Sequence, residues 1–555
     1  MNKTEKSAAE WVEGRTLTKR NSQHDAGARA QNRSSTTSRL LAVRNAAKRD
    51  KARQFTSLMH HLTIDLLEQS FRALSHQAAA GADGVTWAEY ETQLRDNLER
   101  LHRRVQDGTY RPQPARRVLI PKEDGSERPL NILCLEDKIV QQAVVTVLNA
   151  IYETDFLGFS YGFRPGRGPH DALDALIVGI ERKPVNWVLD MDIRKFFDTV
   201  KHGWLLRFLQ HRIQDRRLLR LLRQWLKAGV LDEHGHRVLG TIGTPQGAVV
   251  SPLMANVYLH YVFDLWVQQW RKRHARGMIV VVRYADDVVV GFQNPDDASR
   301  FRREIEVRFQ EFGLAVHPDK TRLIRFGKFA HEQTRKRGLG KPETFNFLGF
   351  THICGVSRQG RFLIHRKTRR DRLQNKLKAL SQELKKRLHQ PVRATGHWLR
   401  SVVQGHLNYY GVPLNGAALS LFCYEVRLRW YRALCRRSQR KRLNWERFGK
   451  IADHWIPKAT IVHPYPHQRF DAKYSRVEPD AGASPVRMCA GGAEESAFLQ
   501  LSVSRPFLSY ASRTTRAASI SFGEGILERG LCQRPVIYDR LSISMIPMSI
   551  ESSVS

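Results

Sequence analysis

The feature that most constrains this chain is the run MIVVVRYADDVVVGF at positions 278–292. Two β-branched apolar runs flank Asp286 and Asp287, a pattern that predicts a hairpin with both acids at its tip. Adjacent carboxylates between buried strands repel each other and are costly to desolvate unless they lie at an opening where a cation neutralises them. A plain polar turn is the simpler interpretation of an isolated Asp-Asp pair.

A second acidic strand favours cation binding over a plain polar turn. NWVLDMDIRKFFDTV, at 186–200, places Asp190 and Asp192 in a similar setting, so a third carboxylate can converge on the hairpin. Mg²⁺ prefers few carboxylates together with water and phosphate oxygens, which suits activation of a primer 3′-hydroxyl and release of pyrophosphate. Phosphoryl transfer is the reaction this implies. Both acids point to the same face of a strand, so alternation alone leaves open which of them binds metal.

Charge indicates the kind of partner. The 555 residues include 91 Lys and Arg against 54 Asp and Glu, a formal charge of +37. Such an excess suits nucleic acid better than a small metabolite, although basic residues also solvate surfaces or touch anionic lipid. Without an apolar run of about 18 residues or a secretory signal, we expect a cytoplasmic protein with no membrane partner. The six cysteines show no paired spacing, which fits reduced thiols.

Composition divides the chain into four parts. Residues 1–55 are polar and basic and predict a flexible N-terminal arm. Residues 56–352 combine helical patterns with short β-branched runs and predict an α+β domain. Residues 353–475 contain long basic helical segments and predict an α-helical domain. Residues 476–555 show little periodicity and predict a poorly ordered tail.

An ordered set of motifs resembles the reverse transcriptases, also called maturases, that group II introns encode. These motifs are AGADGVT (80–86), GTYRPQPARRVLIPKEDGSERPLNI (108–132), FLGFSYGFRPGRGPHDAL (156–173), DIRKFFD (192–198), GTPQGAVVSPLMANVYL (243–259), YADD (284–287), HPDKT (317–321) and FNFLGF (345–350). YADD alone is moderate evidence, and the order of the whole set is the specific part. The resemblance implies a right-hand polymerase, with fingers and a mixed palm sheet over 56–352 and an α-helical thumb and maturase domain over 353–475.

The resemblance also assigns the catalytic residues. It implies that Asp192 and Asp286 bridge two Mg²⁺ ions, with Mn²⁺ as a possible substitute, and that Asp287 lies beside the primer end and helps to position metal. The carbonyl of Ile193 completes one metal site. Asp190 becomes a bystander.

Other motif residues are assigned to the substrates. Lys122 and Arg128 are placed over the phosphates of an incoming dNTP, unless they form an ordinary basic hairpin. Phe197 falls where the family selects deoxynucleotides by blocking a 2′-hydroxyl, although a Phe here could also be core. Gln246 lies in the loop that packs under the templating base. Lys320 supports the primer or the aspartate hairpin, unless it is an idle surface lysine.

The basic C-terminal part predicts a second activity. Residues 355–470 hold 26 Lys and Arg against 5 Asp and Glu, a balance suited to phosphate contacts. Aromatic side chains are interleaved with these cations, where they either stack on unpaired bases or fill a core. They are Trp398, Tyr409, Tyr410, Trp430, Tyr431 and Trp445. The resemblance implies a domain that binds intron RNA and aids its splicing.

These expectations describe an RNA-directed DNA polymerase that copies group II intron RNA from a DNA primer or target with dNTPs, and that also acts as a splicing maturase. We expect no H-N-H endonuclease domain, because no His-Asn-His pattern or paired cysteines follow residue 470. Two alternatives are a non-enzymatic RNA-binding maturase and a domesticated reverse transcriptase without an intron. The sequence leaves the oligomeric state open.

Overall fold

The computed structural model describes residues 27–121, 127–232, 236–238, 242–338, 340–437 and 443–474. They all fall within a compact unit that spans residues 1–495, and a second unit spans 496–555. The tail predicted for 476–555 lies outside the described residues. The four described cysteines are all free thiols.

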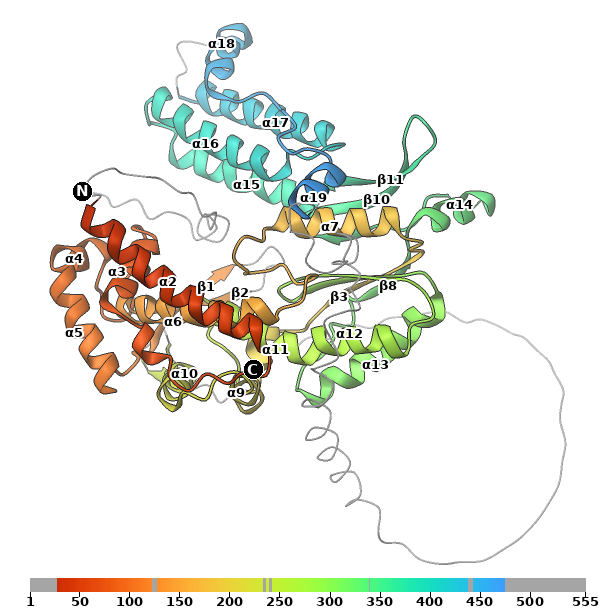
Figure 1. The fold of residues 1–555 in the computed structure, drawn as a ribbon. Coiled ribbons are helices and arrows are strands. Elements are labelled where there is room, and N and C mark those ends of the chain that lie inside the picture. Colours follow the sequence, from red (N-terminus) through yellow and green to blue (C-terminus); the bar gives the residue numbers. More distant parts are fainter. Residues whose placement is uncertain are drawn as a thin grey trace, which may run out of the picture. The chain divides into compact units, whose positions relative to one another are not determined.

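The N-terminal part of the described chain is helical (Figure 1). Its elements are α2 (Gly27–Arg49), η1 (Met59–His61), α3 (Ile64–Ala73), α4 (Trp87–Thr92), α5 (Leu94–Asp107) and α6 (Leu135–Asp155). Helix α2 corrects part of the predicted flexible arm, because it packs on α6 and buries Val43 and Ala47. The guanidinium of Arg212 donates hydrogen bonds to backbone carbonyls at and just after the end of α2, which fixes the helix from a distant segment.

Three sheets follow. The first has the order β2-β1-β4-β5, with β1 (Ala115–Pro121), β2 (Glu127–Ile132), β4 (Val230–Leu231) and β5 (Arg237–Val238). The second, here called the central sheet, has the order β6-β7-β3-β8, with β3 (Trp187–Asp192), β6 (Ile279–Tyr284), β7 (Asp287–Phe292) and β8 (Arg322–Arg325). The third has the order β11-β10-β9, with β9 (Phe345–Phe347), β10 (Phe350–Val356) and β11 (Phe362–Thr368).

The central sheet is not mixed as predicted. Its neighbouring strands all pair antiparallel, because β6 and β7 form a hairpin and β3 runs opposite to both β7 and β8. The parallel pair of named strands lies in the first sheet, between β1 and β4. The α+β class itself is confirmed by helices and sheets that alternate along the chain.

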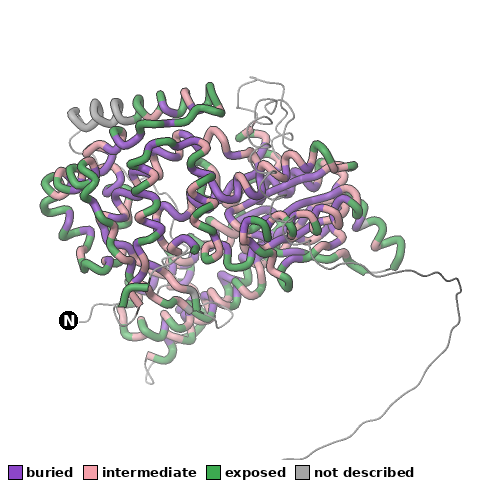
Figure 2. Tube along the Cα trace, turned by 90° about the horizontal axis from the view of Figure 1, so that it is seen from below, coloured by how far each residue is buried: buried purple, intermediate pink, exposed green. Residues whose placement is uncertain are grey.

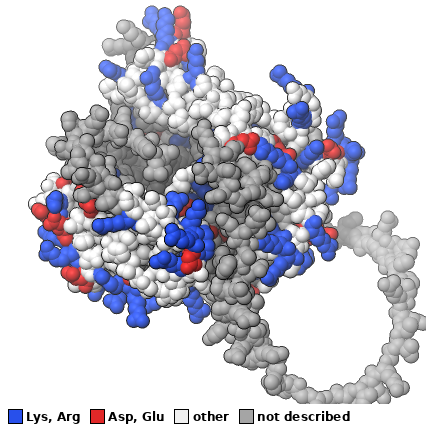
Figure 3. Space-filling model, in the orientation of Figure 1, with Lys and Arg blue, Asp and Glu red and all other residues white. Residues whose placement is uncertain are grey.

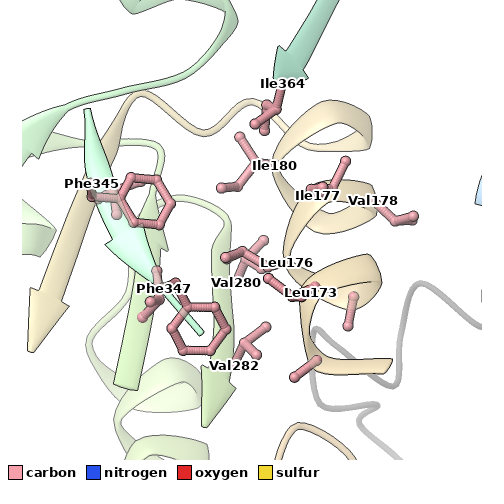
Figure 4. Packing of buried hydrophobic residues seen from close by; sticks show 14 of the residues in the cluster. Leu173, Leu176, Ile177, Val178, Ile180, Val280, Val282, Phe345, Phe347 and Ile364 are labelled. Carbon is pink, nitrogen blue, oxygen red and sulfur yellow. The ribbon is translucent and has the colours of Figure 1, made fainter. Parts of the chain in front are cut away.

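Helices cover both faces of the central sheet (Figure 1). On one face, α7 (Pro169–Arg182) packs on β6, and its other neighbours include β11 of the third sheet. Figure 4 shows Leu173, Leu176 and Ile180 of α7 packed toward side chains of β6 and β9. On the opposite face, α13 (Pro295–Glu311) contacts β3 and β7. Strands β6 and β7 are therefore buried on both sides, and buried residues run through the interior of the molecule in Figure 2.

The remaining helices connect these layers. They are α8 (Phe196–Thr199), α9 (His202–Gln210), α10 (Arg216–Lys227), α11 (Ser251–Leu259), η2 (His260–Asp264), α12 (Leu265–Arg273) and α14 (Lys328–Lys336). Helices α11 and α12 are continuous through η2, a single π-helical turn. Such turns often mark a position where a side chain has a special task.

The described part of the chain ends in a helical region, defined here as residues 370–474. Its helices are α15 (Arg370–Lys386), α16 (Val392–Tyr410), α17 (Gly416–Cys435), α18 (Trp445–Trp455) and α19 (Pro466–Tyr474). Leu373, Leu377, Leu380 and Leu384 recur at helical spacing on α15 and face a core that includes Trp430, which is fully buried. The domain boundary predicted at 352/353 falls inside β10, so β10 and β11 belong to the sheets and the helices begin at Arg370.

The last helix returns to the sheets. Helix α19 packs on α7, and the buried Asp174 of α7 forms ion pairs with Arg366 of β11 at 3.2 Å and with Arg469 of α19. Lys473 and Asp471 of α19 form further ion pairs with α7. None of the described helices is both long and apolar enough to cross a membrane.

Candidate active site

The β6–β7 hairpin forms as the sequence predicts. Tyr284 pairs with Asp287, so Ala285 and Asp286 make a two-residue turn at the tip. Residues 279–283 and 288–292 on either side are buried. Ala285 has a φ of 57°, in the left-handed region that is unfavourable for a residue with a Cβ atom, so its surroundings must hold the turn in place.

A glycine lies directly behind this turn. A Cβ atom on Gly162 would lie 2.2 Å from the backbone nitrogen of Ala285, so no other residue fits here without moving the turn. The amide of Asn256 on α11 donates a hydrogen bond to the carbonyl of Gly162 at 2.8 Å. The tip of the hairpin is thus backed by backbone that is itself held by α11.

Arg283 joins the hairpin to the π-helical turn. Its fully buried guanidinium donates hydrogen bonds to both carboxylate oxygens of Asp264, at 2.8 and 2.6 Å, and to Ser160 Oγ at 2.7 Å. It also reaches the Asn256 side chain at 3.0 Å and the carbonyl of Ala285 at 3.1 Å. One buried cation therefore binds η2, α11 and the turn itself, a geometry that strongly specifies the position of the tip.

The register of β3 brings the third acid to this tip. Asp192 pairs with Asp287 across β3 and β7. The Asp287 side chain remains exposed to solvent, but surrounding protein and the charges of Asp286, Asp192 and Asp190 raise its pKa to about 7. The repulsion among these carboxylates is the conflict that a bound cation would relieve.

Asp190 lies two residues earlier on the same face of β3. Burial, with a smaller contribution from Asp192, raises its pKa to about 7, whereas Arg322, its cross-strand neighbour on β8, opposes the shift. Its position therefore leaves Asp192, and not Asp190, opposite Asp287.

The carboxylate oxygens of these acids are ligands that a hard divalent cation prefers, but they do not surround a metal position by themselves. Among the described residues, no group of three His, Cys, Asp or Glu side chains is spaced to hold a metal ion. Mg²⁺ commonly takes only one or two carboxylates and completes its shell with water and substrate phosphates. The donor set, all carboxylate oxygen at the end of a buried sheet, fits such a partly open site.

Two further predicted residues lie beside Asp192. Lys320 Nζ is 3.5 Å from Asp192 Oδ2, although the lysine side chain is 63% exposed. Ile193 is buried and forms an isolated bridge with Val316, which carries the strand past the acid. Of the adjacent rings, Phe196 is buried against Tyr258, whereas Phe197 is only half-buried. The structure thus assigns Phe196 to the core and leaves part of Phe197 accessible.

The predicted template loop contacts the first sheet. The backbone N–H of Asn131, at the end of β2, donates to the carbonyl of Gln246 at 2.8 Å, and Gln246 Nε2 donates to Asp198 Oδ1 at 3.3 Å. Gly247 has a φ of 104°, and a Cβ atom there would lie 2.5 Å from the Asn131 carbonyl. The close approach explains glycine at this position.

The two predicted phosphate-binding residues are only partly visible. Lys122 lies outside the described residues. Arg128 is in β2, where it pairs with Ile120 of β1, but its side chain is also outside the described part. Their assignment stays a prediction.

The helical region shows cations on exposed surfaces and aromatic rings in two roles. Figure 3 shows Lys and Arg side chains on the visible face, including the upper part where α16–α18 lie. Trp430 is buried in the core, whereas Trp445 is 46% exposed. Trp398, Tyr410 and Tyr431 are half-buried against the same core. The positive charge of Arg372 on α15 slightly opposes the rise in the pKa of Asp287, so α15 contributes to the electrostatics of the acids.

Sequence reasoning missed the pair of Arg283 and Asp264. Its signal was a lone acid inside the apolar run NVYLHYVFDLW and a lone base inside IVVVRY. An isolated charge in an apolar segment is buried only when it is paired, so each of these two residues requires a partner on another segment. The sequence does not show that the two are partners of each other.

Comparison with known proteins gives consistent matches. Residues 120–352 match the model of a family described as reverse transcriptase (RNA-dependent DNA polymerase). Protein YkfC of Escherichia coli is 36% identical over 240 residues, which are 38% of this chain and 62% of that protein. The group II intron-encoded protein LtrA of Lactococcus lactis is 34% identical over 224 residues, 40% of this chain and 37% of that protein.

A plant protein also matches. Nuclear intron maturase 4, mitochondrial, of Arabidopsis thaliana is 32% identical over 141 residues, 25% of this chain and 17% of that protein. The chain thus spans less than two thirds of the length of each of these relatives. The predicted resemblance to group II intron-encoded proteins is confirmed.

Proposed function

We propose that this chain, whose residues 120–352 match the reverse transcriptase family, is an RNA-directed DNA polymerase that copies group II intron RNA into cDNA and assists splicing of that RNA. The observation that carries the proposal is the strand register. It sets Asp192 opposite Asp287 at the end of the sheet where the β6–β7 turn places Asp286.

The three carboxylates supply fixed negative charge for two Mg²⁺ ions, or for Mn²⁺. Ions held by these residues would lower the pKa of the primer 3′-hydroxyl and would neutralise the departing pyrophosphate. In this proposal Asp192 and Asp286 would hold the metal, together with the carbonyl of Ile193. Asp287, whose raised pKa reflects its acidic neighbours, positions metal at the primer end. The Arg283 contacts hold the turn so that its acids need no reorganisation.

A right-hand arrangement accounts for the rest of the chain. In this proposal, the central sheet with α7 and α13 is the palm, the first sheet with the N-terminal helices is the fingers, and α15–α19 form the thumb and maturase domain. The hydrogen bond from Asn131 to Gln246 supports this division, because it joins the fingers strand β2 to the loop assigned to the template.

Substrate contacts are proposed on the same frame. In this proposal Lys122 and Arg128 bind the dNTP phosphates, because fixed cations on the fingers would neutralise them. The accessible part of Phe197 excludes a ribose 2′-hydroxyl. Gln246 supports the templating base, and Lys320, 3.5 Å from Asp192, steadies that carboxylate near the primer.

The exposed cations of the helical region support the splicing role. Acting in the cytoplasm, this surface would hold structured intron RNA through its phosphates while the palm extends a DNA primer or target strand. Neither alternative, a scaffold maturase or a domesticated enzyme without an intron, is favoured by an observation of the site, since all three aspartates are present.

Primer extension tests the proposal. The wild-type protein is given an RNA template, a DNA primer, dNTPs and Mg²⁺, and is compared with an Asp286→Ala, Asp287→Ala double variant. We expect extension by the wild type alone and equal binding of the template RNA by both proteins.

The controls separate the outcomes. Extension by the double variant would overturn the assignment of the acids. If neither protein extends the primer while both still bind RNA, the non-enzymatic scaffold maturase would replace the polymerase as the proposed function.

A further inference from the structure

An open groove of about 680 Å³ lies between α16 and α18 in the helical region. This volume is within the range of small-ligand sites, about 300–1,000 Å³. Arg393, Arg400 and Lys450 line it together with His397 and Trp455, and no acidic residue is among the described residues that line it. A groove with cations, rings and no acid is suited to an anion that also carries an aromatic group.

Packing and hydrogen-bond contacts fix the positions of the side chains in this groove. Helix α16 approaches the Trp455 indole so closely that a Cβ atom on Gly396 would lie 2.5 Å from Trp455 Cδ2. The His397 ring lies edge-on to the indole at 4.4 Å between centroids, and the Arg400 guanidinium is 5.3 Å from the indole centroid. Arg400 also donates to the carbonyl of His454, which fixes its plane in the groove.

The cations at the rim are available for a ligand. Arg393 and Lys450 are exposed, and neither side chain forms an ion pair or hydrogen bond within the described part of the chain. The acids of α18 do not neutralise Lys450 by direct pairing. Glu446, one turn before Lys450, forms no ion pair with it among the described residues, and Asp453 is paired with Arg427.

We propose that this groove binds an unpaired nucleotide of RNA, with the base stacked on the plane of His397 or Arg400 and the flanking phosphates on Arg393 and Lys450. Single-stranded RNA is recognised by stacking bases on His rings and guanidinium planes while cations follow the backbone. A base within a duplex has no free face to offer. The inference rests on the proposed RNA partner and names one site at which that partner is held.

Photochemical cross-linking locates the site directly. The full-length protein is mixed with a short single-stranded RNA that carries 5-iodouridine, irradiated and digested for peptide mass spectrometry. We expect labelled peptides from α16 around His397 or from α18 around Trp455, and loss of the label when unlabelled single-stranded RNA competes. Labelling confined to other regions, or equal competition by the duplex form of the same RNA, would overturn the proposal.

Binding measurements test the roles of the side chains. For Arg393→Gln with Lys450→Gln, the slope of log affinity against log salt should fall by about 1.4, because each phosphate contact on a single strand contributes about 0.7. His397→Ala should weaken single-stranded RNA binding about tenfold, the usual scale of one lost stacking contact. Affinity for duplex RNA should change little in the His397 variant.

A matched variant controls for charge. Lys378→Gln with Arg432→Gln removes two exposed cations from α15 and α17, outside the groove. Equal effects of the two double variants on single-stranded RNA binding would overturn the groove as a site. Primer extension with Mg²⁺ is measured separately. Loss of extension with the cross-link retained would contradict the proposed function alone, and loss of the cross-link with extension retained would contradict this inference alone.

Discussion

The central sheet and the helical region handle charge in opposite ways. In the sheet, β6 and β7 are buried and the acids gather at one end, where Asp192 faces Asp287. In the helical region, cations such as Arg393 and Lys450 lie exposed on separate helices. A charge concentrated at one point demands a counter-ion at that point, whereas dispersed charge accepts many arrangements of a polyanion. Catalysis should therefore depend on individual carboxylates of the sheet. RNA affinity should depend on the combined contribution of many cations on the helices.

The largest effect is expected from two substitutions on one strand. Asp192→Asn keeps the size of the side chain but removes the charge that faces Asp287, so extension should fall at least about a thousandfold, the scale of several kcal/mol of metal catalysis. Asp190→Asn, two residues earlier, should reduce extension only a few-fold. Steady-state primer extension measures both, and RNA affinity should be unchanged. Equal losses in the two variants would contradict the assignment of Asp192.

The second test compares a buried ion pair with an exposed one. Arg283→Met leaves Asp264 buried without its partner and should lower the free energy of unfolding by about 3–5 kcal/mol. Arg427→Met, which breaks the exposed pair with Asp453 in the helical region, should cost less than about 1 kcal/mol. Urea denaturation gives both values.

A double variant refines this second test. Replacing both partners, Arg283→Met with Asp264→Leu, should recover much of the lost stability because no unpaired charge remains. Extension should stay impaired, since the hydrogen bond to the Ala285 carbonyl is still missing. Full recovery of extension would show that the turn does not need Arg283.

The smallest effect concerns pH. Asp287 has a pKa of about 7 in the metal-free protein, above its ordinary range, so it holds a proton below pH 7. Divalent metal competes with that proton, and its affinity should fall by up to tenfold per pH unit below about 7 and level off above it. Mn²⁺ binding followed by electron paramagnetic resonance measures this. Lys and Arg keep their charge over this range, so RNA affinity should change less.

The same contrast explains what the sequence predicts well. The hairpin and the third acid follow from alternation and from the cost of burying carboxylates, both of which are local properties of 186–200 and 278–292. The α+β class follows in the same way. The resemblance in motif order then distinguished Asp192 from Asp190, which alternation could not.

What the sequence missed depends on contacts between distant segments. Helix α2 has a weak apolar pattern and is fixed by Arg212, more than 150 residues away. The antiparallel register of the central sheet is set by how β3 enters between β7 and β8. The partner of Arg283 lies on another element. Strand β10 runs through the boundary predicted at 352/353, and basic residues follow in β11. Tertiary packing decides each of these cases.

The return of α19 to α7 gives the helical region an unusual kind of attachment. Asp174 binds Arg366, where the chain leaves the sheets, and Arg469, where it comes back. The region is therefore a loop closed at its base. A single cut within it would leave a C-terminal fragment that is still held on α7 by the ion pair between Arg469 and Asp174, and the short separation would keep the two fragments at high effective concentration.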